Sequence, residues 1–276
     1  MAQKIWFITG ISSGFGASLA QEVIATGDFV IGTFRDDTKT QTFNQTHTGK
    51  AFAYTLDITQ ITDLQNVVNS IIEKFGRIDV LVNNAGYGFA GAVEEATLEE
   101  VRKVFEANVF GTLALTQAVL PILRSQKSGH IIQMSSHGGI KAFAGFGIYN
   151  ASKFALEGFS EAMAQEVAPL GIKVTIVEPG PFRTNFAGNS FHEAQRSIED
   201  YQQTSGVFRQ KMQEVNGKQE GDPIKASKAI IKIVNSENPP LRLPLGKVPM
   251  ITIAAKLASV QQDLDNYREV AESVVF

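Results

Sequence analysis

Short stretches of strand character recur along the chain, and segments of helical length separate them. These stretches are residues 4–9, 29–34, 51–56, 80–82, 130–134 and 173–177. Strands that alternate with helices indicate βαβ units, which build a parallel sheet. The first and fourth stretches carry consecutive apolar residues, as expected where helices cover a strand on both faces. The sequence therefore predicts an α/β protein with a doubly wound parallel sheet and helices on both faces.

The length of 276 residues suits one large α/β domain or two small ones. After Pro179-Gly180, residues 181–221 form a polar insertion with scattered phenylalanines, and residues 241–246 read as a last strand that Pro244 confines to an edge. We expect one domain over 1–246, with 181–221 as a substrate loop. Residues 247–276 are expected to be a C-terminal helical extension of that domain, which covers the pocket or packs on another subunit.

The composition excludes several classes of function. A net charge of -3 provides no positive field for nucleic acid, and four scattered histidines without any cysteine make a metal site improbable. We also expect no signal sequence and no run long enough to span a bilayer, and hence no membrane partner. A cytoplasmic location is the default expectation.

A glycine-rich turn follows the first predicted strand and opens a helix. Its residues are Gly10, Ser12, Ser13, Gly14, Phe15 and Gly16. Glycines at such a turn let the backbone approach a pyrophosphate and direct N–H groups of the helix toward it. Because the spacing differs from the common G-x-G-x-x-G pattern, the position directly after the first strand carries the prediction of a dinucleotide site.

The second predicted strand ends at Arg35, where many dinucleotide sites have an acid that binds the ribose. A guanidinium at this position suits a 2′-phosphate, which favours NADP(H). The alternative is a surface arginine paired with Asp36 or Asp37, and NAD(H) stays possible.

Tyr149 and Lys153 stand four residues apart, so both lie on one face of a predicted helix. A phenol with a pKa near ~10 transfers protons poorly at neutral pH unless a cation lowers that pKa. Lys153 is placed to supply part of this effect. Taken alone, the spacing is equally compatible with an ordinary surface pair.

Several further motifs occur in order with these two. They are Asp57 after the third strand, Asn83-Asn84-Ala85-Gly86 after the fourth, Asn108, Ser135-Ser136 after the fifth, and Pro179-Gly180. Together they resemble the short-chain dehydrogenase/reductase family, whose single-domain members have a Rossmann fold. The resemblance extends from the first strand to about Gly246.

The resemblance implies roles for four catalytic residues. Tyr149 would be the general acid in carbonyl reduction and the base in alcohol oxidation, and Ser136 would hold the substrate oxygen. Lys153 would lower the pKa of Tyr149 and bind the nicotinamide ribose, while Asn108 would hold a water behind Lys153. Taken alone, Ser136 would read as a strand-end cap and Asn108 as a polar contact in a helix.

The resemblance also implies further cofactor-binding residues. These are Asp57 and Ile58 at the adenine, Asn83, Ala85 and Gly86 beside the adenosine ribose, and Pro179, Gly180 and Thr184 at the nicotinamide. With Arg35 at the end of the second strand, the chain resembles the members of the family that prefer NADP. Relatives commonly form homodimers or homotetramers through helices around Asn108 and Tyr149, so a homo-oligomer is expected.

The substrate is expected to be a hydrophobic or aromatic ketone or alcohol, because phenylalanines are positioned to wall the pocket. The predicted substrate-binding residues are His137, Phe143, Phe146, Phe182 and Phe186, and the alternative for some of these phenylalanines is a place in the core. The sequence thus predicts an NADPH-dependent ketoreductase. The alternatives are an NAD-dependent alcohol or hydroxysteroid-type dehydrogenase and, ranked lower, a nicotinamide-sensing protein without catalysis.

Overall fold

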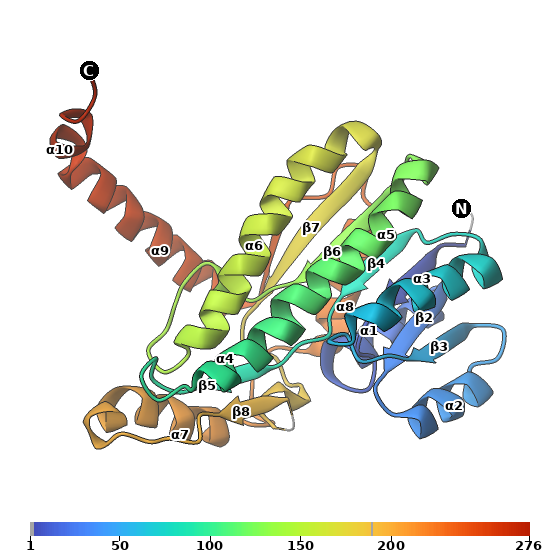
Figure 1. Ribbon diagram of the computed structural model, residues 1–276, viewed down its shortest axis with the longest axis horizontal. Helices are drawn as coiled ribbons and strands as arrows, with labels where there is room; N and C mark the ends of the chain where they lie inside the picture. Colours follow the sequence, from blue (N-terminus) through green and yellow to red (C-terminus); the bar gives the residue numbers. More distant parts are fainter. Residues whose placement is uncertain (1–2, 189) are drawn as a thin grey trace.

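The computed structural model describes residues 3–188 and 190–276, and a seven-stranded parallel sheet lies at its centre (Figure 1). The strands are β1 (Ile5–Ile8), β2 (Phe29–Phe34), β3 (Ala51–Thr55), β4 (Val80–Asn83), β6 (Gly129–Met134), β7 (Ile172–Pro179) and β9 (Arg242–Leu245). Their spatial order is β3-β2-β1-β4-β6-β7-β9. The predicted parallel sheet is confirmed, and β9, with its proline, lies at an edge.

Helices cover both faces of the sheet, as predicted. They are α1 (Gly14–Ala25), α2 (Asp37–Thr46), α3 (Ile61–Phe75), α4 (Leu98–Phe105), α5 (Thr112–Gln126), α6 (Gly147–Val167), α7 (Val207–Glu214), α8 (Pro223–Val234), α9 (Lys247–Asn266) and α10 (Arg268–Glu272). In β1, Trp6 and Ile8 pack toward α1 and α8, whereas Phe7 packs toward α3, α5 and α6. Alternate residues of one strand thereby contribute to two separate cores.

Shorter elements connect these helices. They are β5 (Gly88–Ala90), β8 (Phe191–Glu193), the π-helical turns η1 (Glu106–Gly111) and η6 (Gln202–Gly206), and the 3-10 turns η2 (His137–Gly139), η3 (Ala168–Leu170), η4 (Asn185–Ala187) and η5 (Glu199–Tyr201). The parallel pairing of β5 with β8 attaches the substrate loop to the loop after β4. Helices α9 and α10 follow β9 and extend away from the sheet (Figure 1). The assignment of 247–276 to the same domain remains a prediction.

One helical stretch, Leu98–Gln126, is long and apolar enough to cross a membrane by length and composition alone. The expectation that no segment approaches this length is therefore wrong for this stretch. Half of its apolar window is buried inside the fold, as in the core helices of soluble proteins, so the match is weak evidence for a membrane span.

The buried His130 on β6 makes stability depend on pH. Its Nε2 lies 2.9 Å from the Thr175 hydroxyl, which itself donates to the carbonyl oxygen of Pro240, so Nε2 carries the proton. Burial, assisted by nearby Lys173, lowers the pKa of His130 to about 4. The unfolded chain binds this proton from near pH ~6.5 downward, so the free energy of unfolding should fall between pH 6.5 and 4, by about 3 kcal/mol.

Urea unfolding of the wild type and of His130→Gln between pH 7.5 and 4 measures this effect. The wild-type protein should lose stability more steeply below pH 6.5 than the variant, which has no group to titrate there. Parallel profiles for the two proteins would rule out His130 as the source of the pH dependence.

Candidate active site

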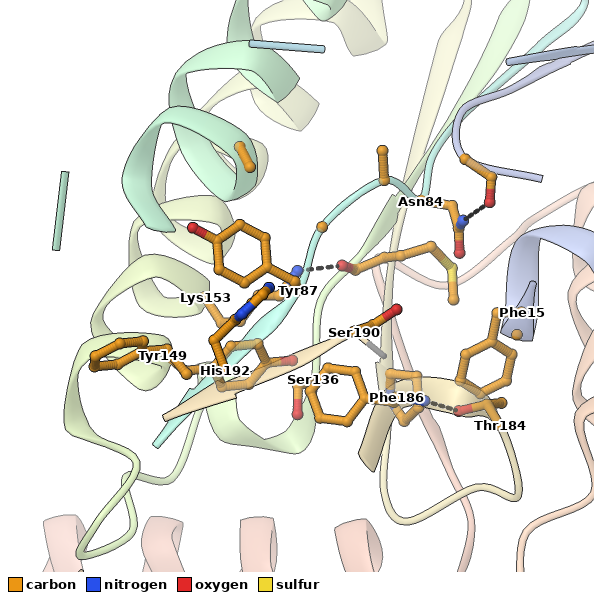
Figure 2. A pocket seen from close by; sticks show the side chains of 18 of the residues that line it. Phe15, Asn84, Tyr87, Ser136, Tyr149, Lys153, Thr184, Phe186, Ser190 and His192 are labelled. Carbon is orange, nitrogen blue, oxygen red and sulfur yellow. Dashed lines mark hydrogen bonds between the residues drawn. The ribbon is translucent and has the colours of Figure 1, made fainter. Parts of the chain in front are cut away.

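A cavity of about 1430 Å³ runs along the carboxyl ends of the strands, where open parallel sheets bind their ligands (Figure 2). Most of the predicted site residues line it. They are Gly10, Ser12, Ser13, Gly14, Phe15, Arg35, Asp57, Ile58, Ala85, Gly86, Ser136, His137, Phe143, Phe146, Tyr149, Lys153, Pro179, Gly180, Phe182, Thr184 and Phe186. Within the described part of the chain, Gly16, Asn83 and Asn108 lie outside this lining.

The turn between β1 and α1 depends on glycine for two reasons. Gly10 and Gly14 have φ angles of +69° and +59°, in the left-handed region that side chains rarely adopt. A Cβ on Gly16 would lie 2.3 Å from the carbonyl oxygen of Gly10, so a side chain would force the turn apart. No side chain caps the first turn of α1 at Ser13, and its N–H groups border the cavity, as an anion site requires.

Asn84 holds this turn, a role that the sequence interpretation did not assign to it. Its side-chain NH2 donates to the carbonyl oxygens of Thr9, at 2.9 Å, and Gly10, at 3.1 Å (Figure 2 shows Asn84 beside the cavity). Asn83, which was expected near the cofactor, instead donates to the buried Thr116 hydroxyl at 2.8 Å. Of the two asparagines, Asn84 borders the cavity.

Arg35 lies exposed at the end of β2 and lines the cavity beside the glycine turn. Its acidic neighbours have other partners: Asp36 accepts the backbone N–H of Lys39 at the start of α2, and Asp37 accepts from the side chains of Gln41 and Thr55. Among the described residues no ion pair joins Arg35 to Asp36 or Asp37, so the alternative of a neutralised surface arginine has no support.

Ser136, Tyr149 and Lys153 converge on the inner end of the cavity (Figure 2). Ser136 follows β6, and its hydroxyl accepts the N–H of Gly138 at 3.0 Å, so it also caps the turn η2. Tyr149 and Lys153 on α6 are only 5% and 7% exposed, which excludes an ordinary surface pair. Lys153 Nζ donates to the carbonyl oxygen of Met134 at 2.8 Å.

Asn108 lies behind this group, on the π-helical turn η1 between α4 and α5. Its Oδ1 accepts the N–H of Tyr87 at 3.0 Å, and its Nδ2 donates to the carbonyl oxygen of Tyr87 at 3.0 Å and to the Ser152 hydroxyl at 3.1 Å. The side chain thus clamps the loop after β4 to α6. A Cβ on Gly86 would lie 2.8 Å from Asn108 Oδ1, so the loop can approach this closely only with glycine.

Burial dominates the ionisation of the catalytic pair. It raises the pKa of Tyr149 well above its ordinary value of 10, although the Ser136 hydroxyl acts in the opposite direction. It also lowers the pKa of Lys153 to about 8, against the effect of Glu157. The expected lowering of the Tyr149 pKa by Lys153 is not found, because the Lys153 ammonium binds Met134 and lies 5.8 Å from the Tyr149 ring centroid.

The outer wall of the cavity is aromatic. Phe146 stacks on Tyr149 with ring centroids 4.2 Å apart, and Phe186 meets the same ring edge-on. His137, 5.0 Å from the Phe143 ring, shares a hydrogen bond with Thr252 on α9 through Nδ1. The rest of the wall comes from the substrate loop, which was expected there, and from α9, through residues that were not named as substrate-binding. These include Ser190, His192, Phe208, Met212, Val248 and Thr252.

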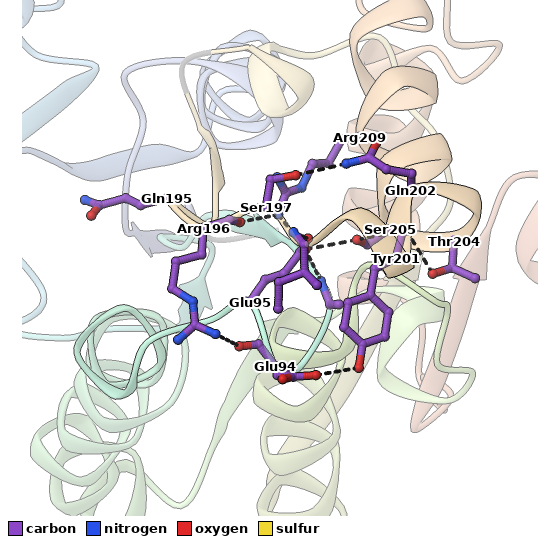
Figure 3. Close-up of polar contacts among 12 residues, drawn as sticks. Glu94, Glu95, Gln195, Arg196, Ser197, Tyr201, Gln202, Thr204, Ser205 and Arg209 are labelled. Atoms are coloured by element: carbon purple, nitrogen blue, oxygen red, sulfur yellow. Dashed lines mark hydrogen bonds and ion pairs between the residues drawn. The ribbon is translucent and has the colours of Figure 1, made fainter.

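The substrate loop is secured by one buried carboxylate, that of Glu95 (Figure 3). Glu95 is 1% exposed, accepts the N–H groups of Ala92 and Ile198, and also binds the Ser205 hydroxyl and the Arg209 guanidinium. Burial alone would raise the pKa of Glu95, but these hydrogen bonds and the charge of Arg209 outweigh it and lower the pKa. The acid therefore stays charged and joins two segments that are about a hundred residues apart.

The chain is similar to many proteins of one kind. The model for short chain dehydrogenases matches residues 4–195. Oxidoreductase BOA17 of Botryotinia fuckeliana is 41% identical over 97% of this chain and 98% of its own length. A 3-ketodihydrosphingosine reductase of Bacteroides thetaiotaomicron is 39% identical over 97% of both chains.

Solved structures agree with this similarity. A short-chain dehydrogenase from Streptomyces avermitilis has a TM-score of 0.94 at 42% identity and covers both chains completely. ElxO, solved with NADP, has a TM-score of 0.72 at 26% identity over 88% of this chain and 97% of its own. A protein from Burkholderia phymatum solved with NAD has the same fold, with a TM-score of 0.82 at 19% identity over 95% of both chains.

Proposed function

Because the chain belongs to the short-chain dehydrogenase/reductase family, and is therefore an oxidoreductase that uses NAD or NADP, we propose that it is an NADPH-dependent ketoreductase. In this proposal it reduces ketones with hydrophobic or aromatic substituents to secondary alcohols. The competing function is the reverse reaction, the oxidation of an alcohol by an NAD-dependent dehydrogenase.

The observation that carries the proposal is the protonated phenol of Tyr149 beside the Ser136 hydroxyl at the inner end of an aromatic cavity. Tyr149 carries a proton at neutral pH, as a donor must, but its raised pKa makes the proton harder to give up, so a nearby cation has to stabilise the phenolate that forms. In the proposed reaction Ser136 binds the substrate oxygen and stabilises its developing charge, and Tyr149 donates its proton to that oxygen. The Lys153 ammonium, 5.8 Å from the Tyr149 ring centroid, stabilises the phenolate by its charge until Tyr149 takes up a proton from solvent.

The residues of the β1–α1 turn fit a dinucleotide. Glycine at Gly10, Gly14 and Gly16 leaves room at the backbone, and the uncapped N–H groups of α1 suit a pyrophosphate. When bound, the reduced nicotinamide supplies the hydride. The exposed guanidinium of Arg35, which lines the cavity beside this turn, suits a 2′-phosphate and so supports the proposal of NADPH over NADH.

Arg35→Asp should reverse the cofactor preference. A charged hydrogen bond to phosphate contributes roughly 1.5–3 kcal/mol, so kcat/KM for NADPH should fall by a factor of about 10–150 while that for NADH changes little. Arg124→Asp on α5 makes the same change of charge at an exposed position outside the cavity and should leave both values unchanged. An unaltered NADPH/NADH ratio in Arg35→Asp would remove Arg35 from the cofactor site.

The substrate class follows from the aromatic wall and the cavity volume of about 1430 Å³, which must also hold the cofactor. The ketone named in the relative from Bacteroides thetaiotaomicron, 3-ketodihydrosphingosine, is a further reason to include long-chain ketones in the assay. NADPH and NADH consumption is measured in parallel with aromatic, aliphatic and long-chain ketones. Turnover confined to small charged substrates, or to alcohols with NAD, would contradict the proposal.

A further inference from the structure

Helix α9 leaves the body of the protein after its first turns (Figure 1). Pro249 is the one buried residue of α9, and the main contacts of the helix are made by its first turns, with β9, η2 and the backbone at Gly180. Thr252 forms the hydrogen bond to His137, and beyond it nearly every residue of α9 is exposed. A helix of 20 residues that contacts its own body only at one end gains little stability from that body.

Six apolar residues, from Met250 on α9 to Tyr267 directly after it, follow a seven-residue repeat in which Ile253 is half-buried and the others are exposed. Met250, Leu257 and Leu264 are each 61% exposed and seven residues apart. Ile253, Val260 and Tyr267 form a second series with the same period, three residues after the first. Spacings of three and four residues in alternation place both series on one stripe, which is the seam by which two helices pair in a coiled coil.

We propose that α9 is a dimerisation helix, which pairs antiparallel with α9 of a second copy of this chain along the seam Met250, Ile253, Leu257, Val260, Leu264 and Tyr267. The seam is self-complementary under two-fold symmetry. With Leu257 opposite Val260 of the second copy, Ile253 lies opposite Leu264 and Met250 opposite Tyr267. Every seam residue then meets an apolar partner.

Charges beside the seam support a second copy as the occupant. Lys256 and Asp263 each precede a seam leucine directly and flank the same side of the stripe. In the antiparallel pair Lys256 of one copy lies within about 3 Å along the axis of Asp263 of the other, and symmetry repeats this ion pair. At the ends Lys247 approaches Arg268, but Arg268 is already paired with Asp265 and Glu272.

The antiparallel direction follows from the attachment of α9. Its first turn contacts the body, so a parallel pair would bring both bodies to the same end of the seam. An antiparallel pair separates the two attachment points by about 25 Å, because the seam spans 17 residues at 1.5 Å each. Pairing would also hold the first turn of α9, whose Val248 and Thr252 line the cavity.

Sedimentation velocity of the full chain tests the proposal. The wild type should be a dimer at micromolar concentration, and Leu257→Asp and Leu264→Asp should each raise the dimer dissociation constant by about 100-fold or more. Ile251→Asp is the matched control, since Ile251 is 69% exposed on the same helix but lies off the seam. Circular dichroism confirms that each variant is folded. A monomeric wild type, or a dimer that survives both seam changes, overturns the proposal.

Charge exchange tests the direction of pairing. Lys256→Asp and Asp263→Lys should each weaken the dimer, and the double variant should restore it, because the two residues are partners only in the antiparallel pair. A double variant that stays weak overturns the antiparallel arrangement. Flotation with anionic phospholipid vesicles tests whether the seam binds a lipid surface instead. A monomer that binds the vesicles through Leu257 and Leu264 would overturn the proposal and assign the seam to lipid. These measurements need neither cofactor nor substrate, so they are independent of the proposed activity.

Discussion

Tyr149→Phe should lower kcat for ketone reduction by a factor of about 10²–10⁴, the usual contribution of a positioned general acid. The change removes one oxygen and keeps the ring that stacks on Phe146, so the cavity wall should stay intact. Binding of NADPH, measured by fluorescence titration, should change by no more than a few-fold. Steady-state rates at saturating ketone then isolate the loss of the proton donor.

Tyr54→Phe is the control for this substitution. Tyr54 lies on β3, is half-buried like many tyrosines of the fold, and does not line the cavity, so removal of its hydroxyl should leave kcat unchanged. If Tyr149→Phe retains more than about a tenth of the wild-type kcat, Tyr149 is not the proton donor and the role assigned to it is wrong.

Arg242→Met should be strongly destabilising, although Arg242 lies outside the apolar cores. The Arg242 guanidinium on β9 contacts Glu157 on α6, lies 3.1 Å from Glu178 on β7 and pairs with Glu161 at the surface. The side chains of Glu157 and Glu178 are 5% and 1% exposed. Removal of the cation leaves two buried carboxyl groups side by side, which should cost about 3–5 kcal/mol of unfolding free energy at pH 8.

The loss of unfolding free energy in Arg242→Met should become smaller as the pH falls. Burial raises the pKa of Glu157, and it raises the pKa of Glu178 to about 7, with the charge of Glu157 acting in the same direction. A carboxyl group with a raised folded-state pKa is favourable while protonated and loses that advantage as the pH rises through this pKa. Both carboxyl groups can therefore take up protons at pH 5. Neutral carboxyl groups need no cation beside them, so the absence of the guanidinium should lower the unfolding free energy less at this pH.

Urea unfolding at pH 8 and pH 5 measures both effects. Arg268→Met serves as the control, because Arg268 is 61% exposed and its surface ion pairs contribute about 0–1 kcal/mol. A loss of the same size at both pH values would show that the two carboxyl groups do not carry the effect.

The sheet, its parallel order and most of the cavity lining could be predicted because they depend on short-range signals. Apolar strands, the glycine turn and the Tyr149–Lys153 spacing each lie within a few residues of sequence. A glycine after a helical stretch is one such signal, and Gly76 caps α3 with a φ angle of +80°.

Other features depend on contacts between distant segments, which leave no local pattern. The pairing of β5 with β8 joins residues about a hundred positions apart, and Thr252 reaches the cavity from a helix that follows the sheet. The clamp that Asn108 forms on the backbone of Tyr87 from the π-helical turn was not predicted, and its expected role of holding a water stays a prediction. The pKa of Tyr149 was also misjudged, since the extent of burial is a property of the folded chain.

The anchoring of the substrate loop by Glu95 has a consequence for how such an enzyme can change. Contacts of Glu94, Glu95 and Glu100 and a three-residue strand pair fix the loop where it meets the body, and none of these three acids belongs to the β1–α1 turn or to the group of Ser136, Tyr149 and Lys153. Residues between these anchors can therefore be exchanged as a cassette while the chemical machinery is inherited unchanged. Substrate selectivity can therefore be transferred with the loop. Grafting this loop between relatives that keep the carboxylate of Glu95 should give enzymes with new substrates.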